Sequence, residues 1–307
     1  MSPIRSDQAT EESTLLPQTP VCDSRDESAT EPFSFSVAFQ SLKRPVVDSA
    51  VKTSIVRRMV YDPRLSGSLV DRLWNDLDSL MHHGSVLSER PRAQVTMIRL
   101  EELLCASASL RGPHDRGASS TPTSLGIIKQ YRLASWGHTL GHMFLPTRAQ
   151  RSWVYGHKLL KAGLLTPRPL AIIEDRAGPL RFRSCVLTEF VPGTRLDRYV
   201  QESAPSAHEL NRLAENFADI WHQLGHLRIS HGDFYPGNLI VTPNDRLSLI
   251  DLDHMKQHWF HHQHSRQRRK DWKYFQKRTR QMPTLWTAFQ SAVERRQSLL
   301  DRICRGA

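Results

Sequence analysis

The sequence has few of the features that mark membrane-spanning, secreted or disulfide-bonded proteins. No apolar run in its 307 residues approaches the ~18 residues that a membrane-spanning helix needs. The opening stretch, MSPIRSDQATEESTLL, lacks the basic start and the continuous apolar segment of a secretory signal. The cysteines are far apart and form no CxxC pair; they are Cys22, Cys105, Cys185 and Cys304. We therefore expect a protein of the reducing cytoplasm.

Acidic residues are scarce in most of the chain, whose net charge is +11. Residues 1–35 hold two basic and seven acidic residues, so they carry −5 and leave +16 for the rest. Between Gln130 and Ile173 there is no Asp or Glu at all. Such an excess predicts anionic partners, namely phosphates, an acidic membrane surface or nucleic acid, although a soluble basic surface is the simpler alternative.

Apolar periodicity is missing from two segments. Residues 1–45 are rich in Ser, Thr, Asp, Glu and Pro, and they lack the apolar content that would let them join a core. Residues 106–124 are rich in Ser, Gly and Pro. We expect a disordered N-terminal tail in the first segment and an exposed insertion in the second.

The remaining sequence alternates between strand-like and helix-like patterns. Strands are predicted for VTMIRL, for LGIIKQY and for the pair PLAIIE and SCVLTEF around the turn DRAGP, and SIVRRMVY is either a strand or a short helix. A helix is predicted at about residues 69–82 from the spacing of Leu69, Leu73, Leu77 and Leu80. Capping boxes at Thr147 and Ser206 begin two further helices.

The second of these capped helices is strongly periodic. Its apolar residues predict a buried face, and they are Leu210, Leu213, Phe217, Ile220, Trp221 and Leu224.

The stretch HGDFYPGN at residues 231–238 carries the most chemistry. Phosphoryl transfer needs a carboxylate aimed at the attacking hydroxyl and oxygen ligands for magnesium. The following segment, LIVTPNDRLSLIDLD, reads as a β-hairpin that turns at PND. Antiparallel pairing returns Asn238 and Asp251 to the same end of this hairpin, beside Asp233. This arrangement of oxygen donors is a plausible magnesium site.

These motifs also resemble a known group of enzymes. HGD-x4-N followed by a hairpin ending in ID resembles the catalytic segment of the protein-kinase-like superfamily, in its bacterial small-molecule branch. The stretch from IIKQY through RAQRSWVYGHKLLKAGLLTPRPLA to LTEFVPG is similar to the lipopolysaccharide kinase (Kdo/WaaP) family, and the resemblance covers roughly residues 85–275. It implies an α+β, bilobal protein-kinase-like fold, with a small β-rich lobe at 46–190 and a mainly helical lobe with basic C-terminal helices at 191–307.

The resemblance implies a role for each residue of the catalytic segment. Asp233 would orient or deprotonate the acceptor hydroxyl, and His231 would support the loop through hydrogen bonds. Asn238 and Asp251 would hold Mg²⁺. Without the resemblance, Asp233 could be a turn residue and Asp251 a cap.

The resemblance also implies an ATP site. Lys129 would pair with the α and β phosphates, and the backbone from Glu189 to Val191 would meet the adenine, with Thr188 at its entrance. Asp253 is a further candidate for a metal or network ligand. Taken alone, Lys129 could be a solvated strand end.

Three departures from the kinase pattern bear on activity. Ser152 stands where related chains place the helix Glu that pairs with the Lys, so Lys129 needs another partner, for which Asp251 is the candidate. No clear GxGxxG precedes Lys129. Tyr235 occupies a position where protein kinases commonly have Lys, whereas an aromatic residue or His is typical of the lipopolysaccharide branch.

The function implied by the resemblance is an ATP- and Mg²⁺-dependent kinase for a hydroxyl of a lipopolysaccharide-core or related glycolipid sugar. Two alternatives stay open, namely a catalytically impaired nucleotide-binding scaffold and a kinase for proteins or small soluble molecules. The basic run from Lys256 to Arg280 and the apolar spacing of Leu285, Phe289 and Val293 indicate peripheral attachment to an anionic membrane. Nucleic acid is the less favoured partner, since no recognition motif is visible.

The segment HMKQHWFHHQH holds five histidines in eleven residues. Their spacings suit no single tetrahedral zinc site, and no Cys lies nearby. We interpret the segment as a solvated surface stretch.

Overall fold

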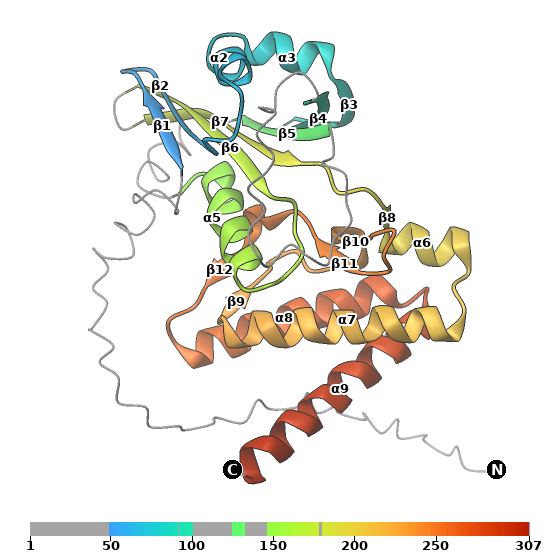
Figure 1. Ribbon diagram of the computed structural model, residues 1–307. Coiled ribbons are helices and arrows are strands. Elements are labelled where there is room, and N and C mark those ends of the chain that lie inside the picture. The colour runs from blue at the N-terminus through green and yellow to red at the C-terminus, as the bar shows by residue number, and fades with distance from the viewer. Residues whose placement is uncertain (1–48, 92, 101–124, 133–145, 178–179, 307) are drawn as a thin grey trace, which may run out of the picture.

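The computed structural model describes residues 49–91, 93–100, 125–132, 146–177 and 180–306. Figure 1 shows an antiparallel sheet with helices on both of its faces, and beneath it a group of helices with short strands. The fold therefore mixes α and β structure, as predicted. The tail expected at 1–45 and the insertion expected at 106–124 lie outside the described residues.

A seven-stranded sheet in the order β1-β2-β6-β7-β5-β4-β3 forms the upper region. Its strands are β1 (Ala50–Thr53), β2 (Arg57–Tyr61), β3 (Ser85–Arg90), β4 (Ala93–Arg99), β5 (Leu125–Arg132), β6 (Pro169–Ala177) and β7 (Leu180–Glu189). The strand around Lys129 and the β6–β7 hairpin are confirmed. The strand predicted in VTMIRL is confirmed as β4, which pairs with β5 so that Val95 lies opposite Lys129. The sequence pattern did not reveal β1, or β3 and its hairpin with β4.

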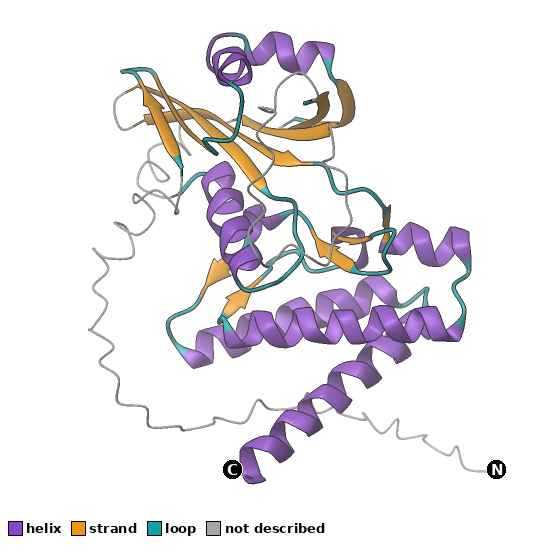
Figure 2. Ribbon diagram, viewed as in Figure 1, coloured by secondary structure: helices purple, strands orange, loops and turns teal. Residues whose placement is uncertain are grey.

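Helices cover both faces of this sheet (Figure 2). On one face, α2 (Gly67–Asn75) and α3 (Leu77–His83) pack on a core that includes Ile128 and Leu187. One helix was predicted here, but the chain breaks at Asp76, whose φ of −126° and ψ of 34° are not helical. Asn and Asp are poor helix formers, and this explains the break at Asn75–Asp76. The predicted apolar face is nevertheless buried.

The other face of the sheet is covered by α5 (Arg148–Lys161). The predicted cap is confirmed at Thr147, whose side chain accepts a hydrogen bond from the amide of Gln150 at 3.0 Å. The helix ends next to Gly163, which has a φ of 79° that favours glycine. Trp153 and Ala149 pack against Val186 of the sheet.

The lower region is built on four helices, α6 (Leu196–Ser203), α7 (Ala207–His226), α8 (His261–Thr279) and α9 (Pro283–Gly306). The capping box of Ser206 and Glu209 at the start of α7 is confirmed, and so is the burial of its apolar face. Phe217 of α7 is the centre of the core, with ring centroids 4.7 Å from Phe275 of α8 and 4.6 Å from Phe289 of α9. Within the described residues, no helix is both long and apolar enough to span a membrane.

Short strands lie between the sheet and these helices. They are β8 (Thr194–Arg195), β9 (Ile229–Ser230), β10 (Leu239–Val241), β11 (Leu247–Leu249) and β12 (Lys256–Gln257), with the 3-10 turns η2 (Pro236–Asn238) and η3 (Leu252–His254). The predicted hairpin is confirmed as β10–β11, which pair antiparallel. Asn238 lies just before β10 and Asp251 just after β11, so each is outside the strand that it was expected to begin or end.

Candidate active site

The loop that carries Asp233 is held by its backbone. Gly232 adopts a φ of 82°, and a β-carbon there would lie 2.7 Å from the carbonyl oxygen of His254, so only glycine fits. The carboxylate of Asp271, on α8, accepts hydrogen bonds from the amides of His231 at 2.8 Å and Gly232 at 3.2 Å. Sequence reasoning gave Asp271 no role. The available signal was that it is the only acidic residue between His254 and Met282.

His231 joins the loop to the hairpin. Its Nε2 lies 3.1 Å from the carbonyl oxygen of Ile250, so this nitrogen must carry the proton. Its Nδ1 is then free to accept from the amide of Asp233, at 3.4 Å. Burial lowers the pKa of His231, and burial raises the pKa of the neighbouring Asp271. A neutral imidazole thus connects the residue before Asp251 to Asp233 itself.

Asp233 and Asn238 contact each other directly. The side-chain amide of Asn238 donates to the backbone oxygen of Asp233 at 2.8 Å and lies 3.4 Å from its carboxylate. The backbone carbonyl oxygen of Asn238 accepts a hydrogen bond from the backbone amide of Ile250 at 2.9 Å. This bond brings Asn238 and Asp251 to the same end of the hairpin, as the antiparallel pattern predicted.

Lys129 reaches this end of the hairpin from the sheet above. Its ammonium group forms an ion pair with Asp251 and lies 3.6 Å from the carboxylate of Asp253. The expected partner of Lys129 is therefore confirmed. Asp251 itself has a φ of 62°, a left-handed conformation that is uncommon for residues other than glycine. The chain turns sharply here and directs Asp251 and Asp253 to the same cation.

Asp253 is fully buried and pairs with a residue that the sequence did not single out. Arg148, in the first turn of α5, contacts its carboxylate at 2.7 Å, and Nδ1 of His254 lies at 2.8 Å. Burial alone would raise the pKa of Asp253, but the hydrogen bond from His254 and the charges of Lys129 and Arg148 together hold this pKa below its ordinary value. The residue stays ionised.

The charges at this contact are the reverse of the protein-kinase pattern, in which the helix supplies the acid. A helix Glu was absent from α5, and its place is taken by Ser152, which is buried. The helix contributes the cation, through Arg148, and the loop after the hairpin contributes the acids.

The backbone expected to meet adenine, from Glu189 to Val191 with Thr188 at its entrance, lies at the end of β7 and just after it. Thr188 and Glu189 end β7, and Val191 follows it. The amide of Glu189 donates to the carbonyl oxygen of Arg168 at 2.9 Å. Among the described residues, the amide of Val191 has no backbone partner.

The oxygen donors at the hairpin end suit magnesium better than a metal held by protein ligands alone. In the described part of the chain, no three His, Cys, Asp or Glu side chains form a group that could hold a metal ion. Mg²⁺ does not need such a cage, because it commonly takes one or two protein oxygens and completes its shell with water and phosphate. The carboxylate of Asp251 and the side-chain oxygen of Asn238 fit that requirement. The Asp251 side chain is 28% exposed and so can be reached from solvent.

The histidines of residues 254–264 do not converge on one point, although the ring centroids of His258 and His264 lie 5.9 Å apart. His254 contacts Asp253, and His258 hydrogen-bonds the hydroxyl of Ser230 at 2.7 Å. His264 is buried on α8, so the segment is not a wholly solvated stretch as expected.

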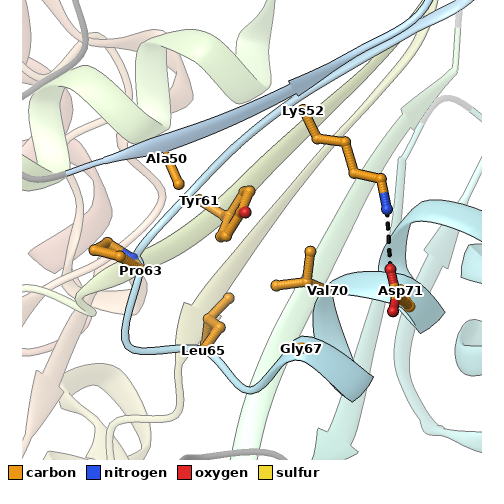
Figure 3. A pocket seen from close by; sticks show the side chains of 8 residues that line it. All are labelled: Ala50, Lys52, Tyr61, Pro63, Leu65, Gly67, Val70 and Asp71. Carbon is orange, nitrogen blue, oxygen red and sulfur yellow. Dashed lines mark hydrogen bonds and ion pairs between the residues drawn. The ribbon is translucent and has the colours of Figure 1, made fainter.

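A shallow hollow lies away from these groups, between β1, β2 and the start of α2 (Figure 3). Lys52 and Asp71 form an ion pair at its rim, at 2.9 Å. None of the residues that line it was predicted as a site residue.

The residues of this site lie within the part of the chain that matches a protein-family model. The model of the lipopolysaccharide kinase (Kdo/WaaP) family matches residues 121–292, more than half of the chain. This span includes every residue discussed above from Lys129 to Asp271. No curated protein matches the chain.

Proposed function

Because the chain belongs to the lipopolysaccharide kinase (Kdo/WaaP) family, we propose that it transfers a phosphoryl group from ATP to a hydroxyl of a lipopolysaccharide-core or related glycolipid sugar. The observation that carries this proposal is the meeting of three distant segments. Lys129 from the sheet, the Asp233–Asn238 pair and Asp251 lie around one end of the hairpin β10–β11.

The nucleotide would bind between the sheet region and the helical region, which act as the two lobes of a kinase-like fold with a boundary near residue 190. The amide of Val191, which has no backbone partner in the described part of the chain, supports adenine binding at the connecting segment, behind Thr188 and Glu189. Lys129 would turn from Asp251 to the phosphates. The hairpin β3–β4, next to β5, would supply the cover that a glycine-rich loop gives elsewhere.

Asp233 would act on the acceptor. It orients the hydroxyl and takes its proton as the acceptor oxygen forms a bond to the γ-phosphorus and ADP leaves. Positioning and electrostatic stabilisation supply most of the catalysis in such transfers. His231 and Asp271 hold the Asp233 backbone in place for this step.

Magnesium, when bound with ATP, would neutralise the phosphate charge. Asp251 and Asn238 are the residues that would hold it. Asp253 would not bind the metal directly, because its carboxylate is paired with Arg148. This assignment requires the Lys129–Asp251 pair to open when the nucleotide enters.

The same ion pair supports a second candidate function. If the Lys129–Asp251 ion pair does not open, Lys129 is unavailable to the phosphates and Asp251 is unavailable to the metal. The chain would then be a nucleotide-binding scaffold. Melting temperature measured with ATP, with and without Mg²⁺, distinguishes the two, because only the kinase reading predicts a stabilisation by ATP that Mg²⁺ increases.

An anionic membrane surface is the proposed location of the acceptor. One face of α8, together with the residue that follows the helix, exposes six cations and no acid, and these are Arg266, Arg269, Lys270, Lys273, Lys277 and Arg280. We name this set the basic stripe. Trp259 and Phe260, just before α8, are 54% and 59% exposed and suit the headgroup boundary.

Two expectations about this surface were wrong. The apolar residues of α9, Leu285, Phe289 and Val293, are buried in the core against α7 and cannot contact lipid. Arg268 does not belong to the surface either, because its guanidinium lies 4.0 Å from the centroid of the Trp221 ring and donates to the Trp221 carbonyl oxygen at 2.8 Å.

Incubating the protein with ATP, Mg²⁺ and separate pools of extracted lipopolysaccharide, protein and soluble sugars tests the proposal. Label in the lipopolysaccharide pool supports it. Label confined to the protein or sugar pool would replace it with the corresponding alternative.

A further inference from the structure

Two tyrosines and an arginine form a cluster beside Asp233 that the roles above do not use. Tyr235 follows Asp233 by two residues, and its ring centroid lies 6.1 Å from that of Tyr274 on α8, nearly edge to face. The guanidinium of Arg278 lies 5.5 Å from the Tyr235 ring and 5.0 Å from the Tyr274 ring. It also donates to the Tyr274 hydroxyl at 2.7 Å.

The opposite side of Tyr235 is bounded by Arg195, the last residue of β8. A β-carbon on Gly237 would lie 2.4 Å from both the Arg195 guanidinium and the Tyr235 ring, so these two side chains meet over this glycine. Arg195 is already neutralised, because its guanidinium pairs with Asp197 at 2.7 Å. The tyrosine ring is therefore held between Arg195 of β8 and the side chains of α8.

Arg278 differs from Arg195 in its charge balance. Within the described residues, it forms no ion pair with a carboxylate, and its side chain is exposed to solvent. The hydrogen bond to Tyr274 and, to a smaller extent, the charge of Asp233 raise the pKa of Arg278. An unneutralised guanidinium thus stands on an aromatic platform close to the residue that would face the acceptor hydroxyl.

From this geometry we propose that Tyr235, Tyr274 and Arg278 form an acceptor subsite that recognises a sugar unit bearing a carboxylate or phosphate near the reacting hydroxyl. The sugar's apolar face would lie on the tyrosine rings, and the anion would pair with Arg278, whose planar fork matches both anions. The inference rests on the proposed function, since it takes Asp233 as the residue at the acceptor hydroxyl.

Binding of three soluble sugars to the full chain tests the subsite without requiring turnover. Saturation-transfer NMR would compare glucose with glucuronate and with glucose 6-phosphate, and the two anionic arms separate carboxylate from phosphate recognition. We expect at least one anionic sugar to bind about tenfold more tightly than glucose, as a charge-assisted hydrogen bond allows. Arg278→Gln should remove this preference, and Arg278→Lys should retain part of it.

The matched control is Arg246→Gln, an exposed arginine at the end of the hairpin away from Asp251. It should leave the preference unchanged. A wild type without preference for either anion, or a preference that survives in Arg278→Gln, would overturn the subsite.

Transfer to lipopolysaccharide, measured in parallel, separates the two proposals. If the wild type transfers phosphate but has no anion preference, the subsite falls and the proposed function stands. If it binds anionic sugars through Arg278 but transfers nothing, the proposed function falls, and the cluster stands as a binding site for anionic sugars but not as an acceptor subsite.

Discussion

At the scale of single residues, the site depends on how two cations share two acids. Lys129 forms an ion pair with Asp251, and Arg148 forms one with Asp253. Lys129 also lies 3.6 Å from the carboxylate of Asp253. Because Asp253 is fully buried, removing either cation leaves a carboxylate with less compensation than folding requires. Arg148 is therefore a positioning residue, which keeps Lys129 and Asp251 available for phosphate and metal.

Replacing Arg148 tests this role. Arg148→Ala should raise the KM for ATP with Mg²⁺ by about tenfold, because Lys129 is drawn toward the uncompensated Asp253. The variant should also lose stability, by about 3 kcal/mol at most, since the Arg148 side chain is 35% exposed.

Arg148→Lys should restore much of the ATP affinity, whereas the exposed Lys161→Ala on the same helix should change neither property. An unchanged KM in a folded Arg148→Ala protein would show that Asp253 does not govern Lys129.

At the scale of elements, α5 and α8 each carry a histidine that folding keeps neutral. Burial lowers the pKa of His157 on α5 and of His264 on α8 to about 4, from an ordinary value of 6.5. Between these values the unfolded chain binds more protons than the folded one, so stability falls as the pH falls. Burial raises the pKa of Asp271, and this acts in the opposite direction.

Thermal unfolding as a function of pH measures the balance. We expect the melting temperature to drop by a few degrees between pH 7 and pH 5, because the histidines with a lowered pKa outweigh the one raised acid; His222, His231 and His258 add to the two named above. His157→Gln and His264→Gln should each reduce the drop, and the exposed His208→Gln should not. A melting temperature that is flat or rises toward pH 5 would contradict this account.

The elements divide into those that local sequence specifies and those that it does not. Caps at Thr147 and Ser206, and the turn in LIVTPNDRLSL, were predictable because each depends on residues a few positions apart. The Arg148–Asp253 pair was not, because no pattern connects residues so far apart in the chain. The break at Asp76 was missed because an unbroken leucine repeat runs across it.

At the scale of the whole molecule, paired charges and unpaired positive charges lie on different helices. Where α7 and α9 meet, acids of α7 pair with arginines of α9, as Glu215 does with Arg295 and Asp219 with Arg296. The basic stripe of α8 has no such partners among the described residues. Exposed cations act additively on an anionic surface, at ~1 kcal/mol each, and salt screens them over about 8–10 Å.

Vesicle binding tests the stripe. The protein should bind vesicles that contain anionic lipid, more weakly as salt rises, and should bind neutral vesicles poorly. Reversing Arg266, Arg269 and Lys270 to Glu should abolish the anionic preference without unfolding. Reversing the exposed Arg72, Arg198 and Arg246 makes the same change in charge elsewhere and should preserve most of the binding. Equal loss in both triple variants would assign the effect to net charge instead of to α8.

The central claim is that Asp233 serves phosphoryl transfer to a lipopolysaccharide hydroxyl, and Asp233→Asn tests it most directly. Transfer from labelled ATP to extracted lipopolysaccharide, with Mg²⁺, should fall by ~10²–10⁴ in this variant. ATP should still raise its melting temperature, because Asn238, Asp251 and Lys129 remain. Wild-type transfer rates in Asp233→Asn would contradict the account, and so would a wild type that binds ATP with Mg²⁺ but labels no lipopolysaccharide.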